Sequence, residues 1–526
     1  MPFQHPHVNQ QTIDWMNKHG TFMQPGVTRL LPVASTSSDI LARWQRVGEV
    51  CQAVVQYAFD NTEPLRPDGS RWSLSNVAVP MRLALSLAAH DVCAQIPDGW
   101  VSPAYQTRLV QAEITPMLVS GSMEIHRLNR TLAIQNLALQ TSGASDGQTL
   151  AGACATGTHG AAIHIGAIHD TVRAVHLMLA PNRAVLLQPA FAPLLSAAAD
   201  DLTAWLGFPT ELVSNDELYH ASLVHLGSLG LVLNMVVETV PLYYLTRVSV
   251  PHLENDPAWK AALQHPGAAS PTPYHFEVLI NPYSPLPSTE PRAWVISMHT
   301  ARFTGQTDVE VRPGTPTPPN PDLVGLISRL LEVLDARPKN PTFRRHVTKQ
   351  LVERYGRTRM EQKATPGVMF GPTGLPESRG DSLEFAFDAQ HALTGVDIIL
   401  DVLKQRLNRG EQFPGGVGIR LVRSSEALLA LNIPNPTCCV ELPSVRTAEL
   451  RPIFEACAAA LHDNGIVFGC HWGQTHLNTP ERVEAWWGNR AQQWRSARAQ
   501  LLPDATSRTV FASRILADTG LGEKDV

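Results

Sequence analysis

The segment from Ser142 to Gly160 constrains the fold of this chain more than any other part of the sequence. It reads SGASDGQTLAGACATGTHG, with five glycines in 19 residues, and most of its other side chains are small. Because so little bulk separates the backbone amides from their surroundings, such a loop can lie directly against a phosphate group or a flat ring. The segment is therefore a candidate binding site for a flat or anionic ligand.

Two short motif matches inside this segment offer other interpretations. Gly152 to His159 matches the first half of a P-loop, but its last two residues stand where Lys and Ser or Thr are required, which disfavours a nucleoside triphosphatase. Gly143 to Gly147 matches the GxSxG elbow of serine hydrolases, with Ser145 as nucleophile and Leu137 to Leu139 as the preceding strand. That elbow requires a helix after it, and the glycines that follow predict a poor helix. The hydrolase is thus the less favoured alternative.

Length and charge exclude other broad classes. The 526 residues correspond to roughly two to four domains, and 44% hydrophobic with 17% charged residues is typical of a folded chain. Lys and Arg total 42 against 47 for Asp and Glu, and no dense basic block is present, so we expect no nucleic-acid partner.

The sequence gives no sign of a membrane span or of export. Its first 17 residues lack a basic start followed by an apolar run, and Ala184 to Ala199 and Leu226 to Val237 fall short of the ~20 uninterrupted apolar residues of a membrane helix. The seven cysteines form no CxxC pair, which favours reduced thiols. We expect a cytoplasmic protein, and the spacing of His159, His164 and His169 predicts no metal site.

The order of secondary structure predicts an α+β fold. Strands are expected at Leu229 to Val240, Phe276 to Ile280 and Trp294 to Met298. A proline-rich break at Arg312 to Pro321 precedes a helix expected at Leu323 to Asp335. We place one domain at residues 1–245, a second at 246–470, and a C-terminal segment at 471–526 that packs back on the first.

The stretch from Gly147 to Gly160, GQTLAGACATGTHG, resembles the flavin-binding signature of the vanillyl-alcohol-oxidase family, in its aldonolactone, alditol and cholesterol oxidase branch. LGSLGLV from Leu226 to Val232 and HWGQ from His471 to Gln474 are similar to two further stretches of that family, in the same order. The resemblance implies FAD as cofactor. It also implies a two-part PCMH-type FAD-binding domain and a substrate domain built on an antiparallel sheet with helices.

The same resemblance implies which side chains and backbone groups hold the cofactor. They lie in three segments: a short stretch near position 70, the glycine-rich segment, and the LGSLGLV stretch. The implied FAD-binding residues are Gly69, Ser70, Arg71, Trp72, Ser73, Ser142, Gly143, Ser145, Asp146, Thr149, Gly152, Ala153, Thr156, Gly157, Thr158, His159, Gly160, Gly227, Gly230 and Leu231.

The chain departs from the family pattern at three positions. Trp72 stands in GSRWS where the family carries the histidine that tethers its flavin, so we expect FAD to be held without a covalent bond. Gly418 stands where the family places the glutamate of Glu-x-Arg, although Arg420 is kept, and Gln474 replaces a lysine. The candidate catalytic residues are Arg420, Glu384, Glu441 and His471, with either glutamate able to supply the missing carboxylate.

The resemblance implies an FAD-dependent oxidoreductase that oxidises a CH–OH group by hydride transfer to flavin N5. A sugar lactone, polyol or sterol-like alcohol is the expected substrate, and molecular oxygen or another electron acceptor reoxidises the flavin. Arg420 is expected to stabilise the charge of the reduced ring. The alternatives are a non-catalytic protein that binds flavin or another ligand, and the serine hydrolase using Ser145.

Overall fold

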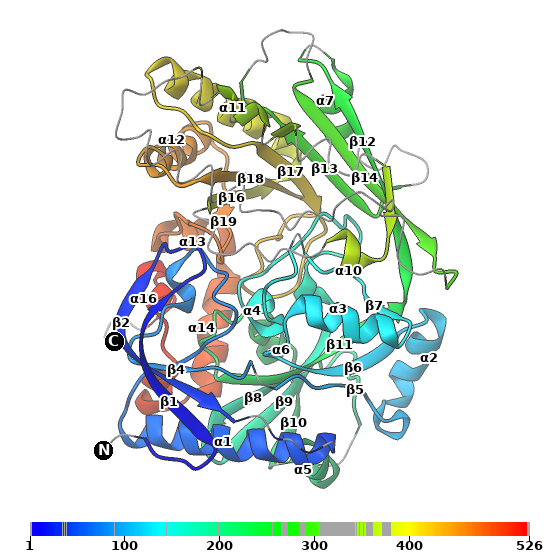
Figure 1. Cartoon of the computed structure of the whole chain (residues 1–526), viewed down its shortest axis with the longest axis vertical. Coiled ribbons are helices and arrows are strands. Elements are labelled where there is room, and N and C mark those ends of the chain that lie inside the picture. Colours follow the sequence, from blue (N-terminus) through cyan, green and yellow to red (C-terminus); the bar gives the residue numbers. More distant parts are fainter. Residues whose placement is uncertain are drawn as a thin grey trace.

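The computed structural model describes residues 3–522, apart from positions 34, 36, 38, 89, 144, 197–198, 208, 255, 265–271, 284–290, 306–341, 343–344, 347, 351, 354–360 and 371–379. The proline-rich break at Arg312 to Pro321 and the helix expected at Leu323 to Asp335 lie outside the described residues. Figure 1 shows two parts, one above the other, with the N- and C-termini both in the lower part.

The strands form three sheets. The first, in the order β1-β2-β4-β3, contains β1 (Val8–Met16), β2 (Met23–Pro32), β3 (Leu65–Pro67) and β4 (Leu83–Leu85). The second, in the order β10-β9-β8-β11-β6-β5 with β7 also on β11, contains β5 (Cys93–Gln95), β6 (Thr115–Ser120), β7 (Leu137–Leu139), β8 (Val172–Ala180), β9 (Arg183–Gln188), β10 (Thr210–Ser214) and β11 (Leu231–Pro241). The third, in the order β15-β12-β14-β13-β17-β18-β16-β19, contains β12 (Tyr243–His252), β13 (His275–Ile280), β14 (Ala293–Arg302), β15 (Glu361–Ala364), β16 (Gly380–Asp388), β17 (Val417–Val422), β18 (Thr437–Val445) and β19 (Gly469–Cys470).

The helices divide between the two parts of Figure 1. Those with the first two sheets are α1 (Ile40–Asp60), α2 (Pro103–Gln111), α3 (Ile125–Ile134), α4 (Leu150–Ala155), α5 (Ala199–Leu206), α6 (Asp216–Leu223), α14 (Asn489–Leu501), α15 (Ala505–Val510) and α16 (Arg514–Thr519). Those with the third sheet or at its border are α7 (Ala258–Gln264), α10 (Pro366–Met369), α11 (Ala392–Asn408), α12 (Leu450–Asp463) and α13 (Pro480–Trp487).

Helices α11 and α12 cover one face of the third sheet. The buried residues of α11 recur every three or four positions, from Val396 through Ile399 to Leu403, which forms a single apolar stripe. Alternate strand residues such as Ile419 and Val440 meet this stripe in one core. Because side chains alternate across a strand, the intervening residues must point to the opposite face, toward the first two sheets.

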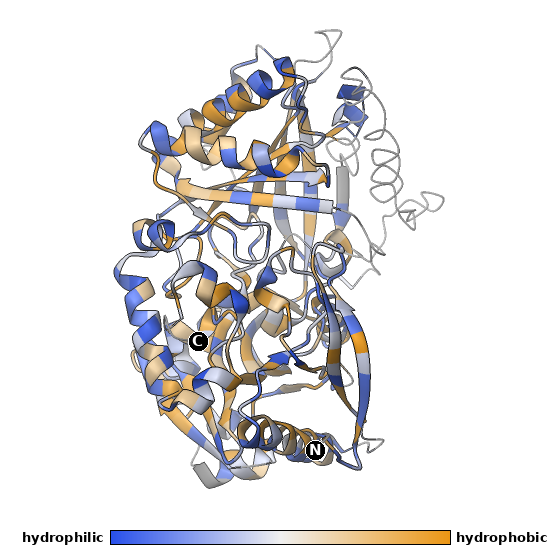
Figure 2. Cartoon of the chain, turned by 90° about the vertical axis from the view of Figure 1, so that its left-hand side faces the viewer, coloured by the Kyte–Doolittle hydropathy of each residue, from blue (hydrophilic) through white to orange (hydrophobic). Residues whose placement is uncertain are grey.

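The C-terminal helices belong to the core of the lower part. Trp494 and Phe511 are fully buried in the same hydrophobic cluster as Val54 of α1 and Met235 of β11. In Figure 1, α14 stands beside the second sheet, although its sequence lies far from the strands of that sheet. Figure 2 shows the same layering by hydropathy, with apolar segments lying between helices and sheets.

Several local expectations are confirmed. The strands expected at Leu137 to Leu139, Phe276 to Ile280 and Trp294 to Met298 are β7, β13 and β14, and the strand expected at Leu229 to Val240 is β11, which begins two residues later and ends at Pro241. The expectation of a poor helix after Ser145 is wrong in part, because the six-residue α4 forms there. The hydroxyl of Thr149 caps that helix by accepting a hydrogen bond from the Gly152 amide at 3.2 Å.

All seven cysteines are free thiols. The side chains of Cys438 and Cys439 lie in different hydrophobic cores, one on each face of β18.

No helix in the described ranges combines the length and apolar character needed to cross a bilayer.

Candidate active site

A cavity of about 610 Å³ lies between the glycine-rich segment and the open face of the third sheet. This volume is within the range of roughly 300–1,000 Å³ that is usual for ligand sites. Most of its walls come from five parts of the chain: residues 66–74, residues 145–159, residues 225–232, residues 471–474 and strands of the third sheet. All four candidate catalytic residues line it: Arg420, Glu384, Glu441 and His471.

Glycines let these walls approach one another closely. A Cβ atom on Gly69 would lie 2.8 Å from the hydroxyl of Thr149, and one on Gly473 would lie 3.0 Å from the hydroxyl of Thr156. The first distance is shorter than real Cβ contacts, and the second is tighter than most of them. Glycine at position 69 therefore lets the stretch near position 70 approach Thr149 of the glycine-rich segment. Glycine at position 473 does the same for the HWGQ stretch beside Thr156.

Hydrogen bonds fix the stretch near position 70 against the HWGQ stretch. Ser73 donates its hydroxyl to the Gly473 carbonyl at 3.0 Å, and Ser75 donates its hydroxyl to the Trp472 carbonyl at 2.6 Å. Arg71 has a φ of 59°, a left-handed conformation that costs a non-glycine residue free energy. Its guanidinium makes two 3.0 Å bonds to the Asp68 carboxylate, which holds this strained turn in place.

Trp72 places an indole at the cavity wall, at the position where the resembled family carries its tethering histidine. The ring lies against Gly147, whose Cβ would come within 2.6 Å of it. Lys18 sits over the ring with its Nζ 4.5 Å from the centroid, and His19 meets it edge-on. The indole is therefore a packed part of the wall, and it offers no nitrogen nucleophile comparable to an imidazole.

Arg66 brings a buried positive charge to the cavity. Its guanidinium donates to the carbonyls of Gly227 and Leu226 at 2.8 Å and to that of Val77. No carboxylate pairs with it among the described residues, and burial lowers its pKa to about 10. A cation buried without a counter-ion is costly, so this end of the cavity suits an anionic group.

Strand register brings the polar residues of the third sheet together. Gly418 lies between Leu279 on one side and Glu441 on the other, and Glu441 in turn lies beside Glu384. The next row, two residues along on the same face, places Arg420 between Glu277 and Cys439. These residues come from four strands, and the alternation of side chains directs all of them away from α11 and α12.

Two carboxylate side chains, those of Glu277 and Glu441, lie beside Gly418, where the resemblance places a glutamate. A Cβ on Gly418 would lie 3.6 Å from Glu277 Oε1 and 4.0 Å from the Cβ of Glu441. A carboxylate from each flanking strand thus occupies the space beside Arg420. Glu277 is a site residue that the sequence reasoning missed, although a single acidic residue within the apolar strand HFEVLI was a usable signal.

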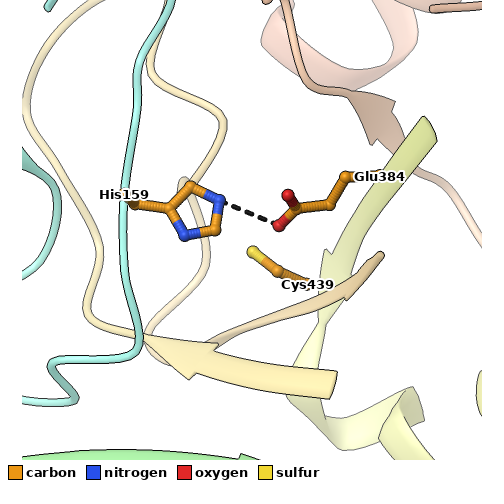
Figure 3. A group of neighbouring side chains, drawn as sticks. All are labelled: His159, Glu384 and Cys439. Carbon is orange, nitrogen blue, oxygen red and sulfur yellow. Dashed lines mark ion pairs between the residues drawn. The ribbon is translucent and has the colours of Figure 1, made fainter. Parts of the chain in front are cut away.

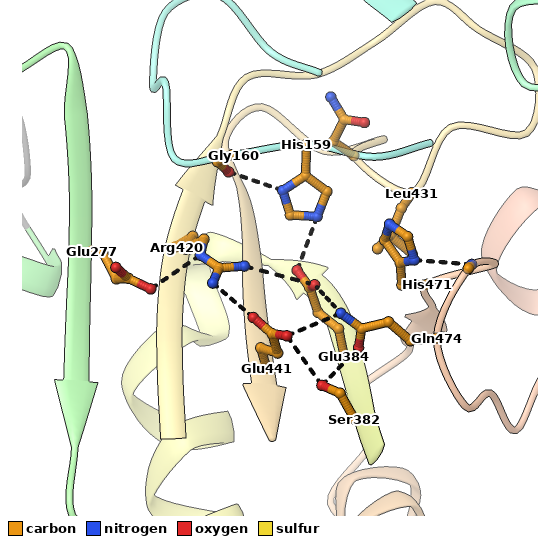
Figure 4. Close-up of polar contacts among 12 residues, drawn as sticks. His159, Gly160, Glu277, Ser382, Glu384, Arg420, Leu431, Glu441, His471 and Gln474 are labelled. Atoms are coloured by element: carbon orange, nitrogen blue, oxygen red, sulfur yellow. Dashed lines mark hydrogen bonds and ion pairs between the residues drawn. The ribbon is translucent and has the colours of Figure 1, made fainter. Parts of the chain in front are cut away.

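Arg420 is the centre of the polar network (Figure 4). Its Nε lies 3.2 Å from Glu277, one Nη lies 2.7 Å from Glu441, and the other lies 4.0 Å from Glu384. Burial alone would raise the pKa of Glu277, but Arg420 and His275 outweigh it and lower that pKa to about 2. Glu441 is the most accessible of the three carboxylates, with its side chain 17% exposed.

The Gln474 side chain joins two of these glutamates. Its Nε2 donates to Glu441 at 3.1 Å and to Glu384 at 3.4 Å, while its Oε1 accepts from the Ser382 hydroxyl at 3.2 Å. Ser382 also lies 3.1 Å from Glu441. The residue that replaces the family lysine therefore positions the carboxylates with an amide rather than with a charge.

His159 and Glu384 form a buried ion pair. The Nδ1 of His159 donates to the Gly160 carbonyl at 3.0 Å, and its Nε2 lies 2.9 Å from Glu384 Oε1. Both ring nitrogens thus lie close to oxygen atoms, which favours protons on both. Burial opposes this charge, but the Glu384 carboxylate prevails and raises the pKa of His159 well above its usual value.

His471 has the opposite protonation state. Its Nδ1 accepts the Gly473 amide proton at 3.0 Å, so the ring proton of the neutral form sits on Nε2. Burial lowers the pKa of His471 to about 4, against a smaller opposing effect of Glu384. At neutral pH this side chain offers the cavity a hydrogen-bond donor.

Six of the residues expected to contact a cofactor do not line the cavity, and instead support its wall: Ser142, Gly143, Asp146, Ala153, Gly157 and Gly160. Gly157 shows the difference most clearly. It has a φ of 71°, and its Cβ would face Val224 and His169, so glycine is needed there for the backbone conformation. The remaining fourteen line the cavity: Gly69, Ser70, Arg71, Trp72, Ser73, Ser145, Thr149, Gly152, Thr156, Thr158, His159, Gly227, Gly230 and Leu231.

The arrangement around Ser145 does not favour the hydrolase. Its hydroxyl accepts a 2.7 Å hydrogen bond from the Gln148 amide, and no histidine is hydrogen-bonded to it within the described part of the chain. A nucleophilic serine needs a base within hydrogen-bonding reach, and Gln148 cannot remove its proton.

Comparisons with known proteins agree with this geometry. Over 129 residues the chain is 29% identical to a D-arabinono-1,4-lactone oxidase of Yarrowia lipolytica, covering 24% of this chain and 20% of that relative. Over 133 residues it is 23% identical to a protein of the same name from Debaryomyces hansenii, covering 25% and 20%. The matches span about a fifth of the length of these curated relatives. No family model matches the sequence.

Solved structures match over nearly the whole chain. A cholesterol oxidase from B. sterolicum superposes with a TM-score of 0.72 at 12% sequence identity, covering 99% of both chains. A solvent-stable cholesterol oxidase superposes with a TM-score of 0.66 at 14% identity, covering 98% of both. The chain therefore has the fold of these oxidases, and the expected α+β fold class is confirmed.

Proposed function

We propose that this chain is a PCMH-type flavoprotein of the vanillyl-alcohol-oxidase family and acts as an FAD-dependent oxidoreductase that oxidises a CH–OH group; its similarity to lactone oxidases and its cholesterol oxidase fold support this proposal. The observation that supports this most strongly is the single cavity that joins the glycine-rich segment to Arg420 and Glu441. In this proposal, residues 1–245 and 471–526 hold FAD, and residues 246–470 supply the substrate side.

The cavity suits FAD at both of its ends. Arg66, buried without a carboxylate partner, matches a diphosphate, which carries negative charge. The glycine-bounded wall near Thr149 gives a flat ring access to backbone groups. When bound, FAD would supply the acceptor for a hydride, which is the redox chemistry that the protein's own side chains cannot provide.

Glu441 is the proposed acceptor of the substrate hydroxyl proton. Glu277 and Glu384 are buried more deeply than Glu441, with side chains 3% and 2% exposed, so a substrate hydroxyl reaches them less readily. Glu441 is more exposed to the cavity, and Gln474 and Ser382 hold its Oε1. In the reaction the carbinol O–H proton passes to Glu441 and the carbinol hydrogen leaves as hydride, which produces a carbonyl.

The other polar residues would orient the substrate and the carboxylates. Arg420 fixes Glu441 and carries positive charge close to the reacting atoms. His471 presents its Nε2–H as a donor, because the Gly473 amide occupies its Nδ1. The substrate class that we propose is a sugar lactone, a polyol or a sterol-like alcohol, with oxygen as the electron acceptor.

A screen of flavin bleaching tests this function. The purified protein should be yellow, and sugar lactones, alditols, oligosaccharides and sterols should be compared for anaerobic loss of the flavin absorption. We expect bleaching by at least one class, and rapid return of the colour when oxygen is admitted. Slow return would indicate another acceptor. A yellow protein that none of these alcohols bleaches would favour the non-catalytic alternative.

Loss of the Arg66 charge should weaken FAD binding. Arg66→Met keeps much of the buried stem and removes the guanidinium, so we expect the Kd for FAD to rise by roughly 10- to 100-fold, in line with about 1.5–3 kcal/mol for a charged hydrogen-bonding group. Reconstitution of flavin-free protein, followed by fluorescence quenching, measures this. An unchanged Kd would place the FAD diphosphate elsewhere.

The flavin should be released by acid. Because Trp72 replaces the tethering histidine, precipitation of the wild-type protein with acid is expected to leave FAD in the supernatant. The matched variant Trp72→His restores the family residue at the same wall position, and a fraction of its flavin should remain in the pellet. Flavin in the wild-type pellet would show that another residue of this chain forms the bond.

A further inference from the structure

We propose that His159, Glu384 and Cys439 form a binding site for one zinc-class divalent cation at the wall of the active-site cavity. The inference rests on the geometry of the three side chains and does not depend on the proposed oxidation. Figure 3 shows that they come from separate segments and point toward one another.

The three donor atoms are close and buried. The His159 Nε2, a Glu384 oxygen and the Cys439 Sγ all lie within 4.8 Å of one another. His159 Nε2 and Glu384 Oε1 are 2.9 Å apart, yet neither atom makes an aligned hydrogen bond with any described residue. The imidazole nitrogen, the carboxylate oxygen and the thiol sulfur are therefore close enough together to bind one ion.

The surroundings of His159 match those of a metal ligand. Its Nδ1 donates to the Gly160 carbonyl at 3.0 Å, which fixes the ring and directs Nε2 inward. Histidine ligands of metals commonly have this backbone partner on the second nitrogen. Glu384 is fixed in a similar way, because its backbone carbonyl accepts from the His471 amide and its second oxygen accepts from Gln474.

The donor set selects the class of ion. Nitrogen, oxygen and sulfur ligands together suit zinc and similar cations, whereas magnesium and calcium prefer oxygen alone. Zinc-to-ligand bonds of about 2.0–2.3 Å place tetrahedral donor atoms roughly 3.3–3.7 Å apart, so shifts of under about 1 Å would complete the site. The ion replaces one proton on His159 and one on Cys439, and both are released to solvent.

The fourth coordination position would open to the cavity. His159 and Glu384 both line it, whereas Cys439 approaches from the sheet behind them. A bound cation would remove the imidazolium and engage the carboxylate next to Arg420. Occupancy of this site should therefore inhibit any chemistry in the cavity.

Metal binding to the holoprotein tests the site without an activity assay. We expect equilibrium dialysis against ZnCl₂ to give one tightly bound zinc per chain, and CdCl₂ to produce a thiolate-to-metal absorption band. Cys439→Ser and Cys439→Ala should abolish the band and weaken zinc binding by at least about 100-fold, since even outer-shell partners contribute 10- to 100-fold. Flavin content and thermal melting verify that each variant folds.

Cys438→Ser is the matched control. Its side chain lies on the other face of β18, in the core under α11 and α12, so zinc and cadmium binding should be unchanged within about twofold. The proposal is overturned if the wild-type protein binds no zinc. It is equally overturned if Cys439→Ser retains the tight site, because the ion would then lie elsewhere on the protein.

Discussion

Arg420→Ala is expected to lower the free energy of unfolding by about 3–5 kcal/mol, because removing one partner of a buried ion pair leaves the other partner uncompensated. Glu277 would be the residue most affected, since its buried carboxylate has Arg420 at 3.2 Å. Flavin reduction by substrate should also slow by roughly 100- to 1,000-fold, as for loss of one charge-stabilising donor. Chemical denaturation and anaerobic stopped-flow measure the two effects.

A double variant separates folding from catalysis at this position. Arg420→Met with Glu277→Gln also removes the buried carboxylate that loses Arg420 while keeping similar volumes, so most of the lost stability should return. Flavin reduction should remain slow, because the positive charge beside Glu441 is still absent. Recovery of both properties would show that Arg420 acts only by holding the sheet face together.

Glu441→Gln should have the largest effect on the chemical step. The amide keeps the shape of the side chain but cannot take a proton, so we expect flavin reduction to slow by about 100- to 10,000-fold with FAD still bound. Glu277→Gln is the comparison, because that side chain is also a carboxylate beside Arg420 but lies deeper. The Glu277→Gln variant should lose at least tenfold less of its flavin-reduction rate than Glu441→Gln. The reverse order would assign the proton acceptor to Glu277.

The sequence brought together most of the residues that line the cavity, but it did not predict which residues of the glycine-rich segment face it. The glycine-rich motif located Thr149, Thr158 and His159, and the family resemblance located Arg420, Glu384 and Glu441; all of them line one cavity. A local motif carries its backbone geometry with it, so its residues stay together in any fold that contains it. The motif could not show that Gly157 turns away from the cavity, because that depends on a single φ angle.

Some contacts of the site depend on strand pairing, which the sequence alone did not predict. Glu277 and Arg420 lie 143 residues apart along the chain, and only the pairing of β13 with β17 places them side by side. A one-residue shift in β13 or β17 would turn either side chain to the opposite face. Arg66 lies 160 and 161 residues from Leu226 and Gly227, and its contact with their carbonyls depends on how β3 packs against the loop before β11 rather than on strand register.

Anaerobic reduction of the bound flavin by an alcohol deuterated at the carbinol carbon tests the central claim most directly. If the cavity carries out hydride transfer from a CH–OH group, the best substrate of the screen should bleach the flavin in the wild-type protein. Its carbinol-deuterated form should bleach the flavin several-fold more slowly, because that C–H bond breaks in the measured step. Equal rates for the two forms, or no bleaching by any alcohol, would contradict the account.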